Sequence, residues 1–181
     1  GLFADAPFTF AGRHYRIDGL ESYPKSAQRP HPPLLIGGGR RRMLTLAGRE
    51  ADIVSILSTS VGSGVVADDP AERLPAAVAE KIDWVRAGAG SRFPEIELSL
   101  IPTLVLAADR RAATDDLIRE RGWRDVTREQ VWAMPSVLIG SAEQLVDDLR
   151  RRRAEFGFSY YVVSDDEMEA FAPVAARLVG T

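Results

Sequence analysis

Cysteine is absent from the 181-residue sequence, and histidine occurs only at His14 and His31. Without cysteine the chain forms no disulfide, no thiolate metal site and no cysteine nucleophile, which fits the reducing conditions of the cytoplasm. The two histidines form no HxH or HExxH pattern, so a histidine-based zinc site is not indicated. We therefore expect no bound metal, and surface or packing roles for both histidines.

Long hydrophobic runs and an excess of charge of one sign are also missing. The longest apolar runs are of strand length, and the 23 basic and 26 acidic residues leave a net charge of −3. These values argue against a membrane or a nucleic acid as partner and favour a small-molecule substrate. The amino end has no signal peptide pattern and begins at Gly1 rather than Met, which indicates a processed form or a piece of a longer chain.

The first 33 residues predict a hairpin followed by an extended approach. Apolar and polar residues alternate over residues 8–10 and 14–17, and Gly12 lies in the turn between them. Prolines then exclude a helix up to Pro33.

From residue 34 onward, four short apolar runs alternate with helical patterns. Strands are expected at residues 34–36, 53–57, 96–106 and 158–163, with Pro102 marking a bulge or a position without strand pairing in the third. Helices are expected at residues 40–50, from 70 to the stop signals Gly88 and Gly90, at 111–121, 128–132 and 142–156, and at 167–178. The stretch 58–64, rich in glycine and serine, is expected to be a loop. This order predicts an α/β fold with a parallel sheet, in one unit over residues 1–181.

Two helix starts carry clear capping signals. Asp69 precedes Pro70 and stands three residues before Glu72, and an apolar stripe then begins at Leu74 and continues through Val78, Ile82 and Val85. Ser141 and Gln144 form a capping-box pattern, and Gly157 supplies the stop signal of that second helix.

The sharpest chemical signal is the triple glycine Gly37, Gly38 and Gly39, followed by Arg40 at a helix start. Glycines let a backbone approach an anion closely, a helix amino end offers free amides, and an arginine adds a charge-assisted contact. The pattern lacks the Lys-Ser/Thr of a P-loop and is not GxGxxG. Two readings remain open, a phosphate site and a tight turn with solvated arginines.

Other candidate residues have an ordinary structural explanation as well as a functional one. Ser55 and Ser58 lie at the carboxyl edge of a strand but in no G-x-S-x-G elbow. Trp123, Trp132 and Met134 suit either an apolar pocket or the core.

For the two charged clusters the sequence favours a structural role, either on a solvated helix face or as a helix cap. Residues 150–153 are expected to form a solvated helix face paired with Asp147 and Asp148, and the acidic residues 165–167 to cap the last helix rather than bind a metal. No nucleophile, base and orienting group can be assembled from the sequence, so the catalytic residues stay unknown. Any reactive atom would come from a cofactor.

Four segments in order resemble the luciferase-like monooxygenase superfamily, in particular its F420-dependent oxidoreductase branch. They are residues 32–54 (PPLLIGGGRRRMLTLAGREADIV), residues 10–15 (FAGRHY), residues 137–145 (VLIGSAEQL), and Gly157 with the strand at 160–163. The family fold is a (β/α)₈ barrel, and such barrels take roughly 250 residues. The resemblance therefore implies strands five to eight of that barrel, preceded by a hairpin insertion.

The resemblance also implies a chemistry. Gly37, Gly38, Gly39 and Arg40 match the turn that holds the cofactor's phosphate in family members, which implies a hydride transfer between F420 and an organic substrate. FMN, in a monooxygenase, is the alternative cofactor. A third reading is a non-catalytic half-barrel scaffold. The implied partners are a second copy, in a homo-oligomer, or a separate amino-terminal half.

Overall fold

The computed structural model of the protein describes residues 3–58, 60–62 and 65–180. Contacts divide the chain into two compact units, Gly1–Leu34 and Leu35–Thr181. The boundary lies next to Pro33, where the extended approach was expected to end.

The first unit is built on the predicted hairpin. Strands β1 (Phe8–Ala11) and β2 (Arg16–Leu20) pair antiparallel, and the register shifts between Phe8 and Phe10. The amide of Gly12 donates to the carbonyl of Tyr15 at 2.9 Å and closes the turn.

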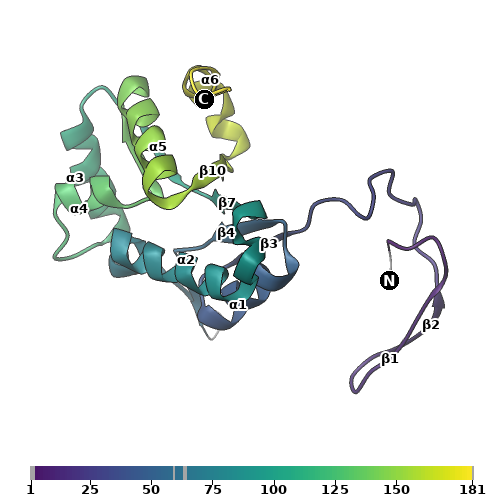
Figure 1. Ribbon diagram of the computed structural model, residues 1–181. Helices are drawn as coiled ribbons and strands as arrows, with labels where there is room; N and C mark the ends of the chain where they lie inside the picture. The colour runs from purple at the N-terminus through teal and green to yellow at the C-terminus, as the bar shows by residue number, and fades with distance from the viewer. Residues whose placement is uncertain (1–2, 59, 63–64, 181) are drawn as a thin grey trace. The chain divides into compact units, whose positions relative to one another are not determined.

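The second unit contains a four-stranded parallel sheet, which confirms the predicted α/β class. Its strands are β3 (Leu35–Gly38), β4 (Ile53–Ile56), β7 (Glu97–Leu100) and β10 (Phe158–Tyr161), in the order β10-β7-β4-β3. Strands β3 and β10 lie at the two edges of this sheet (Figure 1).

Two strand predictions need correction. Strand β3 continues through Gly37 and Gly38, so only Gly39 of the three glycines lies in the turn. The run expected over residues 96–106 is two strands, because Pro102 has no amide to donate and the chain leaves the sheet there. Its second part, β8 (Thr103–Leu106), pairs instead with β9 (Val137–Gly140) in a separate parallel pair.

Six α-helices follow the strands along the described part of the chain. They are α1 (Arg41–Glu50), α2 (Pro75–Ala89), α3 (Arg110–Arg121), α4 (Arg128–Ala133), α5 (Ala142–Phe156) and α6 (Met168–Ala176). Three short 3₁₀ turns lie next to helix ends: η1 (Pro70–Arg73) before α2, η2 (Gly90–Glu95) after α2, and η3 (Asp165–Glu167) before α6. Each predicted helix is present. The helix at residues 142–156 has the predicted ends, and the ends of the others differ.

The helix expected from Pro70 onward is divided in two. Asp69 does cap a helix, since its carboxylate accepts the Ala71 amide, but this helix is the short turn η1. Leu74 is extended, with ψ of 152°, because the following Pro75 disfavours a helical conformation there. Gly88 lies inside α2, and Gly90, with φ of 58°, ends the helix.

The capping box at Ser141 and Gln144 is confirmed at the start of α5. Gly157 adopts a left-handed conformation at its end, as the stop signal predicts. The capping box and the glycine stop depend only on neighbouring residues, so the folded chain has both as the sequence predicts.

The segment 58–64, expected to be a loop, contains part of a small hairpin. Strands β5 (Ser60–Gly62) and β6 (Val65–Ala67) pair antiparallel, while Thr59, Ser63 and Gly64 lie outside the described residues.

Three apolar clusters hold the second unit together. Helices α1 and α2 pack on one face of the four-stranded sheet, where Leu44, Val54 and Val85 are fully buried (Figure 1). The β8–β9 pair lies between two further clusters, one formed with α3 and α4 and one with α5 and α6.

Candidate active site

The carboxyl ends of the four parallel strands meet at one edge of the sheet, where α/β proteins gather ligands. The glycine run reaches this edge at the end of β3, and Leu57 follows β4 there. The amide of Leu57 donates to the carbonyl of Gly38 at 2.8 Å, which ties the two strand ends together.

A side chain at position 38 would crowd Met43. A Cβ atom at Gly38 would lie 2.6 Å from Cγ and 3.1 Å from Cβ of Met43, in the first turn of α1. At Gly37 the nearest atom would be Ser55 Cβ at 3.6 Å, which is an ordinary contact. The structure therefore explains Gly38 by the close approach of α1 to its strand.

The amino end of α1 carries positive charge where a helix favours negative charge. Arg40 is the cap residue in an extended conformation, no side chain caps the helix, and the first turn holds no acidic residue. Arg41 and Arg42 follow in that turn and are exposed. The helix dipole and these arginines repel one another, and a bound anion would relieve that repulsion.

A hollow of roughly 630 Å³ continues from this end along α1. Arg41, Arg42 and Arg49 line it together with Thr45 and Leu46. It is a cationic surface that begins beside the glycine turn.

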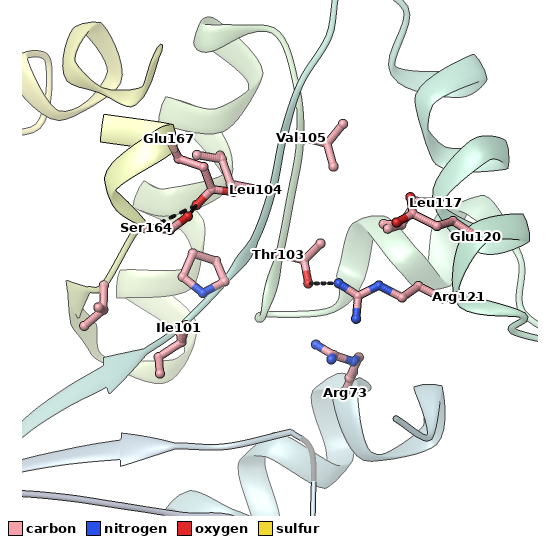
Figure 2. Close-up of a pocket in the computed structure, with 12 residues that line it drawn as sticks. Arg73, Ile101, Thr103, Leu104, Val105, Leu117, Glu120, Arg121, Ser164 and Glu167 are labelled. Carbon is pink, nitrogen blue, oxygen red and sulfur yellow. Dashed lines mark hydrogen bonds between the residues drawn. The ribbon is translucent and has the colours of Figure 1, made fainter. Parts of the chain in front are cut away.

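A second cavity, of about 480 Å³, opens beyond the ends of β7 and β10 (Figure 2). Ile101 and Pro102, which separate β7 from β8, line it on one side, and Leu117 and Arg121 of α3 on another. Arg73 of η1 reaches it from below α3 in the view of Figure 2. No sequence pattern singled out Arg73 or Arg121 as a site residue.

Asp68 joins the two arginines of this cavity. Nε and Nη2 of Arg73 lie 2.7 and 2.6 Å from Asp68 Oδ1, and Arg121 Nη1 lies 2.9 Å from Asp68 Oδ2. Arg121 lies 53 positions from Asp68, so no local pattern could have found this cluster.

The serines at the strand ends are buried but form no nucleophilic set. Ser55 and its neighbour in the sheet, Ser99, have hydroxyls that meet no hydrogen-bond partner among the described residues. Ser58 donates to Ser136 at 3.1 Å. These contacts identify no base beside any of the serines.

The helix face at residues 150–153 is not wholly solvated, which corrects the sequence prediction. Arg152 is 2% exposed, and its Nη2 donates to the carbonyls of Met134 at 3.1 Å and Val137 at 2.5 Å. Asp148 is equally buried and binds Arg110 and Arg151, each at 2.7 Å. Burial lowers the pKa of Arg152 to about 10, and the Asp148 carboxylate opposes this shift.

The remaining candidates lie in structural positions. Trp123 and Met134 belong to the second apolar cluster, and Trp132 packs against it, so core packing rather than a pocket explains them. The acidic residues 165–167 form the turn η3, where Glu167 forms a capping box with Ser164. Within the residues that the structure describes, no three acidic or histidine side chains gather to hold a metal ion.

The histidines lie in the first unit, and none of the described helices could cross a membrane. His14 is exposed, and His31 Nδ1 lies 2.8 Å from the carbonyl of Pro32. The described helices are too short or too polar to span a bilayer.

Solved structures of similar fold are about twice as long as this chain. The F420-dependent tetrahydromethanopterin reductase from Methanopyrus kandleri is 15% identical with a TM-score of 0.62, over 90% of this chain and 54% of the reductase. A monooxygenase from Streptomyces bottropensis is 18% identical with a TM-score of 0.62, over 97% of this chain and 56% of that enzyme. A riboflavin lyase solved with modified FMN is 13% identical with a TM-score of 0.60, over 94% of this chain and 48% of the lyase.

These matches show the fold, and the chain spans about half the length of each matched structure. The model of the luciferase-like monooxygenase family matches residues 1–160. This match, over most of the chain, shows that the chain belongs to the luciferase-like monooxygenase family, and the parallel sheet agrees with it.

Proposed function

We propose that this chain is the carboxyl-terminal part of an F420-dependent oxidoreductase that transfers a hydride between F420 and an organic substrate. The observation that carries the proposal is the uncapped, arginine-rich amino end of α1 at the end of β3. The first-turn amides and Arg40 would hold the cofactor's phosphate, and Gly37, Gly38 and Gly39 would let it approach the backbone. When bound, F420 supplies the hydride chemistry, and the residues of this chain anchor and orient it.

The arginines along α1 favour F420 over FMN. FMN ends in its phosphate, whereas F420 carries further carboxylates beyond its phosphate. Arg41, Arg42 and Arg49 line a hollow that begins at the glycine turn, and would place positive charge where those carboxylates continue. An FMN-dependent monooxygenase is the alternative, because an FMN phosphate would need only the first turn of the helix.

A fluorescence titration of the protein with F420 and, separately, with FMN tests the cofactor. We expect F420 to bind more tightly than FMN. The double substitution of Arg41 and Arg42 by glutamine should weaken F420 binding about thirtyfold, since two lost charge-assisted contacts at roughly 1 kcal/mol each remove about 2 kcal/mol. Arg150→Gln, at an exposed position of α5, is the matched control and leaves the affinity unchanged. Tight FMN binding without F420 binding would overturn the choice of F420.

We also propose that the face of the sheet away from α1 and α2 associates with another half-barrel. Strands β3 and β10 have no strand neighbour on their outer sides within the described residues, and unpaired edges invite association. On the face away from α1 and α2, Leu35 is 48% and Tyr160 40% exposed. The partner is either a separate amino-terminal half or a second copy of the chain, and the latter also fits a non-catalytic scaffold.

A further inference from the structure

Lys81 of α2 is a buried cation whose three hydrogens all meet an acceptor. Its side chain is 2% exposed. Its Nζ lies 2.8 Å from Oε2 of Glu72, 3.1 Å from the carbonyl oxygen of Glu72 and 3.2 Å from the carbonyl oxygen of Leu57. These contacts use the full donor capacity of an ammonium group. Lys81 therefore acts through the residues that it holds, and not by binding a ligand itself.

The contact with Leu57 leads directly to the glycine turn. Leu57 follows β4, and while its carbonyl accepts from Lys81, its amide donates to the carbonyl of Gly38 at 2.8 Å. Gly38 is the last residue of β3, and only Gly39 separates it from Arg40, the cap residue of α1. A chain of two hydrogen bonds thus joins Lys81 to the end of the strand from which the turn begins.

The other side of the turn is fixed on α2 as well. Gly48 of α1 lies so close to α2 that a Cβ atom there would collide with the carbonyl oxygen of Val85, and Gly88 of α2 approaches Thr45 of α1 in the same way. Val85 lies four residues after Lys81, one turn along the same face of the helix. Helix α2 therefore holds α1 by close packing and the end of β3 through Lys81 and Leu57.

The positive charge of Lys81 makes the link to Leu57 firm. A hydrogen bond from a charged donor is shorter and stronger than one from a neutral donor. An apolar side chain of the same length would fill the same space but would donate to neither carbonyl. Because Glu72 belongs to η1, the ammonium group also keeps this turn beside the end of β4.

We propose that Lys81 is a positioning residue for the cofactor, which fixes Leu57 and, through it, the turn from Gly38 to Arg40 in the conformation that receives the phosphate. The proposal rests on the proposed function, because it concerns the affinity of that same phosphate site. A turn that is ordered before binding needs no further ordering when the ligand arrives, so a loosened turn binds more weakly with the same contacts.

Fluorescence titration with F420 tests the proposal on two variants. In Lys81→Met the apolar stem remains but Leu57 loses its donor, and we expect F420 to bind about tenfold more weakly. Glu72→Gln is the matched control, because it removes the ion pair but leaves Lys81 able to donate to both carbonyls. Its affinity for F420 should change by less than about twofold. Thermal unfolding measures the stability of both variants, and a purely structural role predicts that affinity falls with stability in each.

Amide hydrogen exchange, followed by NMR without cofactor, gives a second readout. The Leu57 amide should exchange about tenfold faster in Lys81→Met, relative to the Val85 amide within α2, since the local opening there becomes easier. Glu72→Gln should leave this ratio as in the unsubstituted protein. The ratio corrects for any general loss of stability.

Unchanged F420 affinity in Lys81→Met, an equal loss in Glu72→Gln, or an unchanged exchange ratio for Leu57 would overturn the proposal. If Lys81→Met does not fold, Lys81→Gln, which is shorter and uncharged, takes its place with the same expected losses. If neither F420 nor FMN binds the unsubstituted protein, the proposed function fails, and the exchange of Leu57 still decides whether Lys81 holds the turn.

Discussion

Single residues in this protein show how burial changes a charged or polar group. Arg73, Lys81, Asp148 and Arg152 are each at most 5% exposed, and each is bound to oppositely charged or carbonyl groups. Lys81, for example, donates to the carbonyls of Leu57 and Glu72 and pairs with the Glu72 carboxylate at 2.8 Å. Such groups stabilise the fold only while their partners remain.

The buried hydroxyl of Tyr161, like those of Ser55 and Ser99, has no hydrogen-bond partner among the described residues. We predict that Tyr161→Phe leaves the free energy of unfolding at neutral pH unchanged or raises it by about 1 kcal/mol, since it removes an unsatisfied polar atom. Urea unfolding measures the change. Tyr160→Phe, at a 40% exposed position, is the control. A clear loss of stability in the Tyr161 variant would contradict the prediction.

The same substitution should alter the response to alkali. Burial raises the pKa of Tyr161 to about 12, while the Arg152 cation opposes the shift. In the unfolded chain this phenol ionises near its ordinary pKa of about 10. The native protein therefore loses stability relative to the phenylalanine variant as pH rises from about 10 to about 12, by roughly 2–3 kcal/mol. Below pH 10 this difference is absent.

At the scale of elements, α1 and α2 cross at glycines rather than at large side chains. A Cβ atom at Gly48 would collide with the carbonyl oxygen of Val85, and one at Gly88 with the carbonyl oxygen of Thr45. Both collisions are with backbone, so they cannot be relieved by a side-chain rotation. The two helices approach closely because these positions carry no side chain.

We predict that Gly48→Ala and Gly88→Ala each lower the free energy of unfolding by about 1–3 kcal/mol. Alanine favours a helix over glycine by about 1 kcal/mol, so a net loss would report the collision between helices. Chemical denaturation measures both variants. Gly37→Ala serves as the comparison, because its Cβ would meet only an ordinary 3.6 Å contact. Equal or higher stability of the helix variants would show that α1 and α2 separate easily.

The elements also show which predictions local sequence supports. The capping box at Ser141 and Gln144 and the stop at Gly157 depend on residues within one or two turns, and they are present as expected. Pro102 predicts either a bulge or a position without strand pairing, and the sequence does not reveal that β8 leaves the main sheet there to pair with β9. Which strands pair depends on long-range packing, which a local sequence pattern does not contain.

At the scale of the whole molecule, the parallel sheet ends in two edge strands, β3 and β10, which have no outer strand neighbour in the described part of the chain. We predict that the isolated chain associates in solution, because edge strands invite pairing and Leu35, Tyr160 and Ile101 remain accessible. Light scattering over a concentration series measures the mass. Addition of a separately produced amino-terminal half should replace this association with a one-to-one complex. A stable monomer that does not bind the amino-terminal half would contradict the proposal for either partner, the second copy or the separate half.

Periodicity, caps and glycines act over a few residues, so the sequence alone predicted the amino-terminal hairpin, the helices and the turn after β3. It did not predict the division of residues 96–106 into two strands or the hairpin of β5 and β6. It also carried the resemblance to the luciferase-like family, which the family match over residues 1–160 confirms. Only the tertiary structure brought Asp68, Arg73 and Arg121 to one cavity and buried Arg152, since long-range packing decides which charges leave water. The glycine turn and the arginine cavity are thus complementary results, one local and one produced by the fold.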